Sequence, residues 1–77
     1  MKNKNYCTTD LYLGAFLKAR GVKLLNSRHE NGKVFFVFQD DGECEKLIQD
    51  FLNNQEVKIG DYLQALDNLK KLIFRNF

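Results

Sequence analysis

The chain has 77 residues, of which 44% are hydrophobic and 29% charged, and its formal net charge is +2. These values are typical of one globular domain spanning residues 1–77, and they exclude two-domain, fibrous and low-complexity organisations. A single core of this size contributes only about 3–5 kcal/mol to stability. We therefore expect the chain to complete its core as a homodimer.

The cysteine count and the hydropathy of the chain indicate where in the cell the protein is found. Cys7 and Cys44 are the only cysteines and form no CxxC pair, which excludes a zinc cage and a dense disulfide framework. The apolar stretch at residues 11–17 follows Asp10 and is too short for a signal peptide or a membrane span. We expect a soluble protein in the cytoplasm.

The first predicted element is a helix over residues 9–20. Capping side chains precede it in Thr8-Thr9-Asp10, and Gly21 follows where a left-handed residue ends many helices. Its first turns are apolar nearly all round, so we expect it to be covered on more than one side. Gly14 within it indicates a close approach by another backbone. Residues 1–7 are predicted to be a flexible segment.

A β-hairpin is predicted over about residues 22–38. Asn31-Gly32 is the strongest short-range signal for a two-residue hairpin turn. Residues 34–38 are apolar on both faces, which favours a strand covered on both sides by helices or a second subunit. The turn predicts these cross-strand pairs: Glu30 with Lys33, Ser27 with Phe36, and Leu25 with Phe38.

Two more helices are predicted. Asp40 and Glu43 have the spacing of a capping box before an apolar stripe that ends near Asn53. Residues 57–59 alternate as in a short third strand, and Asp61 with Gln64 repeats the capping spacing before a helix over residues 62–74. The buried stripe of that last helix is predicted to be Tyr62, Ala65, Leu66, Leu69, Leu72 and Ile73.

The predicted class is therefore α+β. Its element order is α-β-β-α-(β)-α, with a small two- or three-stranded, mainly antiparallel sheet packed with three helices.

Three runs of the chain resemble a small family of bacterial or bacteriophage proteins known only as a domain of unknown function. The most specific part is the opening Thr8-Thr9-Asp10-Leu11-Tyr12-Leu13. The other matching runs are the rest of residues 7–21, residues 34–38, and Tyr62, Ala65 and residues 69–73. The resemblance implies one compact domain and brings no activity, ligand or site residue.

No recognisable catalytic constellation is present. His29, the only histidine, adjoins the predicted turn, and Ser27 would share its side of the strand without a third group to orient the pair. Carboxylates near residues 40–45 could hold a hard cation, but helix capping explains them better. The glycines form no phosphate-binding loop. We expect that the protein is not an enzyme, has no catalytic residue and binds no metal or cofactor.

Charge is distributed unevenly along the chain: +5 over residues 1–33, −5 over residues 34–56 and +2 over residues 57–77. We expect a non-catalytic interaction module that binds a second copy or another protein. The predicted contact surface is the apolar strand, through Val34, Phe36 and Phe38, or the helix over residues 9–20. The alternative is nucleic-acid binding, in which aromatic rings stack on bases and cations meet phosphates. The residues predicted for this alternative are Lys23, Arg28, Lys33, Phe35, Lys70, Lys71 and Arg75.

Overall fold

A computed structural model describes residues 4–75 of the chain, with side chains through Phe74. The expected α+β class is confirmed, with three helices and a three-stranded antiparallel sheet. In chain order the elements are β1 (Lys4–Thr8), α1 (Leu11–Ala19), β2 (Leu24–Glu30), β3 (Lys33–Asp40), α2 (Cys44–Leu52) and α3 (Ile59–Arg75).

The β2–β3 hairpin forms as the Asn31-Gly32 pair predicts. Both residues have positive φ, 52° and 77°, as a two-residue turn of this hand requires. The predicted pairs of Glu30 with Lys33 and Ser27 with Phe36 are confirmed. The pair predicted for Leu25 is wrong, because a β-bulge between Leu24 and Asn26 makes Leu24 the partner of Phe38.

The third strand is β1, which pairs antiparallel with β3 and makes β3 the central strand. The prediction of a strand at residues 57–59 is wrong, since Ile59 already begins α3. The prediction of a flexible segment over residues 1–7 is also wrong where it overlaps β1; residues 1–3 lie outside the described residues. Tyr6 of β1 packs against the core, which ties this strand to the rest of the molecule.

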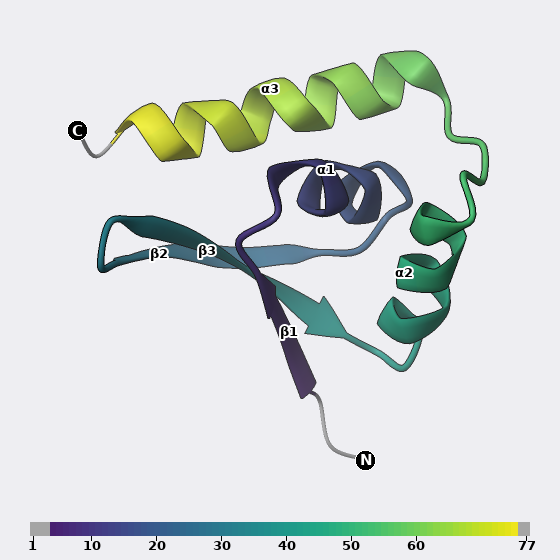
Figure 1. Cartoon of the computed structure of the whole chain (residues 1–77), viewed down its shortest axis with the longest axis horizontal. Coiled ribbons are helices and arrows are strands. Elements are labelled where there is room, and N and C mark those ends of the chain that lie inside the picture. The colour runs from purple at the N-terminus through teal and green to yellow at the C-terminus, as the bar shows by residue number, and fades with distance from the viewer. Residues whose placement is uncertain (1–3, 76–77) are drawn as a thin grey trace.

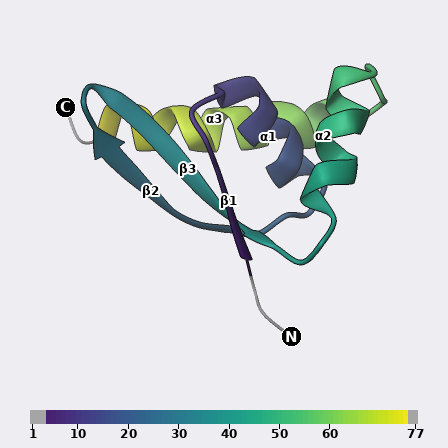
Figure 2. The ribbon, with the colours of Figure 1, turned by 60° about the horizontal axis from the view of Figure 1, so that its bottom comes forward.

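Helix α1 lies between the sheet and α3, as Figure 1 shows. Its buried residues include Leu13, Ala15, Phe16 and Leu17, which confirms that it is covered on more than one side. In Figure 2 the strands pass in front of the helices, so within the described residues helices cover only one face of the sheet. The expectation that β3 is covered on both faces is therefore wrong for the single chain.

Gly14 lies where α1 packs tightly against both α3 and β3. A Cβ added there would lie 3.1 Å from Cδ1 of Leu69 on α3 and 3.6 Å from the rings of Phe36 and Phe38 on β3. The close approach that this glycine indicates is thus made by side chains, and the predicted approach by another backbone is wrong. Phe36, Phe38, Leu17 and Leu69 are the largest fully buried side chains.

The caps differ in detail from the predicted motifs. Asp10 is the N-cap of α1, where its Oδ1 accepts hydrogen bonds from the backbone N–H groups of Tyr12 and Leu13. Before α2, Asp40 Oδ1 accepts from the N–H groups of Gly42 at 2.8 Å and Cys44 at 3.4 Å, while Glu43, at the N-cap position, makes no side-chain cap. Asp40 therefore caps Gly42 and Cys44 and not Glu43, and the predicted capping box of Asp40 with Glu43 is wrong.

Candidate interaction surfaces

The residues predicted for self-association lie in the core of the chain itself. Phe36 and Phe38 are fully buried, and Val34 packs against the same cluster on the helix-covered face. These three residues occupy every second position of β3, so their side chains point to the same face of the sheet. That face is occupied by α1, so the predicted dimer surface on these residues is wrong.

The basic residues predicted for nucleic-acid binding are spread over the segment before β2, the hairpin and α3. Lys23 precedes β2 at the end of the strand away from the turn, where it lines a hollow with Asp41 and Glu43. Arg28 and Lys33 belong to the hairpin, and Lys70 and Lys71 to α3. Figure 1 places the hairpin turn and the C-terminal end of α3 at the same end of the molecule, on different layers. Arg75 ends α3, and its side chain lies outside the described part.

Two of these cations already have acidic partners. Arg28 forms an ion pair with Glu30, with Nη1 and Oε2 2.7 Å apart. Lys71 Nζ lies 3.2 Å from Oδ2 of Asp67 one helical turn earlier. These exposed pairs reduce the net positive charge that either position offers to a polyanion.

The sheet face without helices carries Phe35 close to the hairpin turn. The Arg28 guanidinium lies 5.4 Å from the centre of the Phe35 ring, within cation–π range, because the two residues are cross-strand partners. Val37, on the same face, is only 6% exposed, and its neighbour Cys7 on β1 is exposed. This face therefore offers one partly exposed ring and its cation, with little other apolar area.

Three of the exposed large apolar side chains lie on α3, and the others, Tyr12, Leu25 and Leu52, lie on three different elements. Ile59, Leu63 and Phe74 are 68%, 55% and 70% exposed, and they recur on one side of the helix. Asp67 and Lys70 lie between them on the same side, within an arc of about 80° at 100° per residue. We call these five residues the outer row of α3. Exposed leucine and phenylalanine side chains aligned on a helix are typical of a contact surface.

Sequence reasoning missed the outer row. It assigned only the stripe around Ala65 and Leu69, which is confirmed as the buried or half-buried side of α3. The signal was nevertheless present, because positions 59, 63, 67, 70 and 74 are spaced by three or four residues, as one face of a helix requires. The spacing could not say which of the two stripes α1 would cover.

Tyrosines border the outer row where α1 meets α3. Partial burial raises the pKa of the Tyr62 hydroxyl, and the nearby Tyr12 and Asp10 raise it further. Tyr12, at the start of α1, is itself largely exposed. Tyr12 therefore adds apolar surface close to the N-terminal half of α3.

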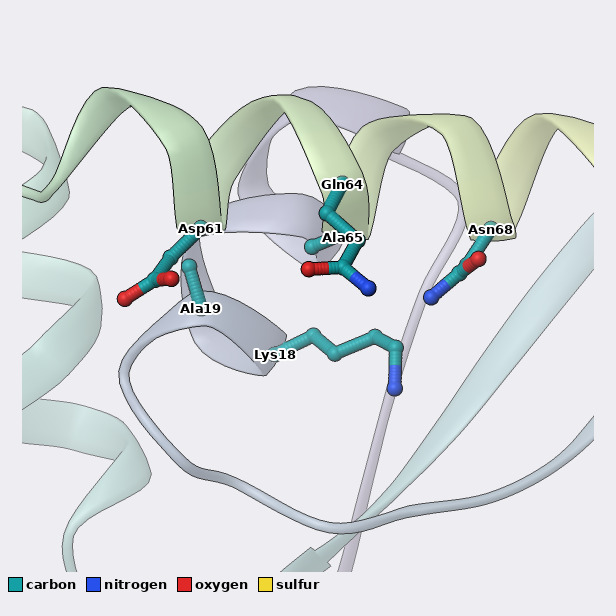
Figure 3. Close-up of a pocket in the computed structure, with 6 residues that line it drawn as sticks. All are labelled: Lys18, Ala19, Asp61, Gln64, Ala65 and Asn68. Atoms are coloured by element: carbon teal, nitrogen blue, oxygen red, sulfur yellow. The ribbon is translucent and has the colours of Figure 1, made fainter.

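A polar hollow of about 240 Å³ lies on the other flank of α3 (Figure 3). Gln64 and Asn68 project from α3 toward the Lys18 side chain of α1, with Asp61 beside them. The hollow is smaller than the roughly 300–1,000 Å³ of typical ligand sites and has only two alanines as apolar lining. It therefore does not define a small-molecule site.

Ser27 and His29 lie on the same side of β2, as predicted, opposite Phe36 and Val34 of β3. Within residues 4–75 no group of three or more His, Cys, Asp or Glu side chains is arranged to hold a metal ion. Burial, and then the charge of Asp40, raises the pKa of the Cys44 thiol to about 11, which leaves the thiol protonated at neutral pH. Among the described residues, no helix is long and apolar enough to cross a membrane.

The arrangement defines a class: a small α+β domain whose three-stranded antiparallel sheet has helices on one face. A family model for the domain of unknown function DUF5659 matches residues 3–75, so the chain belongs to this family. The resemblance to a family of unknown function is thereby confirmed. Comparisons with curated proteins and with solved structures found no match.

Proposed function

We propose that this protein is a non-catalytic interaction module that self-associates as a weak homodimer through the outer row of α3. The observation that carries the proposal is the exposure of Ile59, Leu63 and Phe74 along one side of a 17-residue helix. Burial of apolar surface drives most protein association. The sheet face without helices is a weaker candidate, since Val37 is already almost covered there.

The size of this surface supports a weak dimer. Residues 63–74 span only about 18 Å of helix. Two such segments in contact bury far less than the roughly 800 Å² per partner of a stable interface. We therefore expect a dissociation constant between about 1 μM and 1 mM.

Sedimentation equilibrium over about 10 μM to 1 mM protein, the range that matches such affinities, tests the proposal. We expect the apparent mass to rise from monomer toward dimer with concentration. Leu63→Glu should remain monomeric, because it places a charge in the contact. Leu52→Glu is the matched control, since Leu52 is also exposed, at 65% against 55% for Leu63, but lies on α2. This variant should dimerise like the unaltered chain. A wild-type chain that stays monomeric throughout would overturn the proposal.

A second candidate function is binding of single-stranded nucleic acid at the face of the sheet without helices. It is favoured by the partly exposed Phe35 ring with Arg28 against it, and by Lys33 at the turn. Stacking of one base on an aromatic ring is worth about 1–3 kcal/mol. Fluorescence anisotropy with labelled single-stranded RNA at low and physiological salt tests it. Equal binding by the wild type and Phe35→Ala, or no binding at low salt, would argue against this function.

The proposal places the module in the cytoplasm of a bacterial cell. The two free cysteines, one of them exposed, fit a reducing compartment. Cell fractionation of the tagged chain tests this, and recovery outside the cytoplasmic fraction would contradict it.

A further inference from the structure

We propose that the partner of α3 is the α3 of a second copy, antiparallel to the first about a two-fold axis. In this arrangement Asp67 faces the partner's Lys70, and Leu63 faces the partner's Phe74. The inference rests on the proposed function, because it specifies how four residues of the outer row, those from Leu63 to Phe74, are used. It adds a register and an orientation, both of which can be tested separately from dimerisation itself.

The first step is the spacing of the outer row. Positions 63, 67, 70 and 74 are separated by four, three and four residues, the alternation of the two seam positions in a coiled-coil heptad. Helices with this spacing keep one seam in contact over several turns. Leu63 and Phe74 are exposed at its two ends, and Asp67 and Lys70 occupy its middle.

Charge then selects the orientation. In a parallel pair in register, Asp67 would face the partner's Asp67 and Lys70 the partner's Lys70, and these like charges repel. In the antiparallel pair each of the two seam positions faces the other kind of seam position on the partner helix. Asp67 of each copy therefore faces Lys70 of the other, and the two-fold axis repeats this contact. The same two-fold axis places Phe74 of each copy against Leu63 of the other. The four residues from Leu63 to Phe74 are therefore complementary to themselves only when the helices are antiparallel.

The charged groups are available for this contact. Asp67 and Lys71 are paired within the chain, but both side chains remain largely exposed, at 63% and 74%. Such a pair leaves carboxylate lone pairs open for a second cation. Within the described residues, no ion pair involves Lys70, which is exposed on the outer row. Lys70 can thus meet the partner's Asp67 without breaking an existing contact.

Charge reversal tests the register. Asp67→Lys alone and Lys70→Glu alone each replace two attractive contacts by two repulsive ones, so we expect each to weaken the homodimer about tenfold or more. An equimolar mixture of the two variants should form a heterodimer. The lysine at position 67 of the first variant then faces the glutamate at position 70 of the second, and Lys70 of the first faces Asp67 of the second. The double variant Asp67→Lys with Lys70→Glu should regain dimerisation, since it only exchanges the signs. Sedimentation equilibrium measures all four samples.

Lys58→Glu provides the control, because it changes the net charge as Lys70→Glu does but lies before α3, outside the seam. We expect the dissociation constant of its dimer to lie within about threefold of the wild-type constant. If the wild type dimerises but the single reversals do not weaken the dimer, or the mixture fails to restore it, the antiparallel register is overturned while the proposed function stands. If the wild type never dimerises, both fail.

Discussion

Gly14 on α1 and Leu69 on α3 meet so closely that a Cβ on the glycine would lie 3.1 Å from Leu69 Cδ1. Leu69 is fully buried, and the rings of Phe36 and Phe38 confine the same space from β3. One missing side chain thus lets α1 fit between the sheet and the helix that carries the outer row. The position of α3 depends on this contact.

We therefore expect Gly14→Val to destabilise the protein by about 1–3 kcal/mol through overpacking. Gly60→Ala is the comparison: Gly60 lies in the first turn of α3, has no heavy atom within 4 Å of an added Cβ, and should gain up to about 1 kcal/mol from helix propensity. Urea unfolding followed by circular dichroism measures both. Equal effects of the two substitutions would show that the contact with Leu69 does not limit packing.

The hairpin turn depends on positive φ at Gly32. Gly32→Ala should cost about 1–2 kcal/mol, because an L side chain at φ 77° is strained although the surroundings are open. Asn31→Gly should cost little or nothing, since glycine adopts its φ of 52° readily. Thermal unfolding compares the two, and an unchanged midpoint for Gly32→Ala would contradict this explanation of the turn.

Stability should fall in acid partly because of Asp40. The hydrogen bond from the Gly42 N–H group lowers the pKa of this carboxyl below its usual value of 3.8 in the folded chain. A carboxyl with a depressed folded pKa stabilises the protein above its unfolded pKa, and that contribution disappears as the pH falls through the folded pKa. We expect Asp40→Asn to lose less stability than the wild type between neutral pH and pH values below 3.8. Parallel acid-induced losses in urea unfolding would contradict the assignment.

The two thiols should differ in reactivity. Cys7 is exposed on β1, whereas Cys44 is buried and its pKa is raised to about 11. A thiol reagent added to the native protein should modify one cysteine rapidly and the second only after unfolding. Cys7→Ser should abolish the rapid reaction, while Cys44→Ser should leave it unchanged. Rapid modification of both thiols in the native state would show that Cys44 is more accessible than the structure indicates.

Some features could be predicted because their causes are local. The Asn31-Gly32 turn sets the pairing of Glu30 with Lys33, and the 3.6-residue period identified the buried side of α3 around Ala65 and Leu69. The N-terminal strand was missed because Lys4–Thr8 becomes a strand only by pairing with β3, about thirty residues later in the chain. Short strands of this kind depend on long-range partners more than on their own pattern.

The sequence by itself determined the α+β class, the hairpin with its register next to the turn, and two of the residues that later proved central, Gly14 and Phe36. The tertiary structure decided which other residues each of these two residues contacts. Phe36, predicted to face a partner, fills the core because α1 covers its side of the sheet, and the alternation along β3 leaves Phe35 on the other side. Likewise, α1 covers the Leu69 stripe of α3 and leaves Leu63 exposed. A periodic pattern marks apolar faces, but only the packing of distant elements determines which face is buried and which remains available for binding.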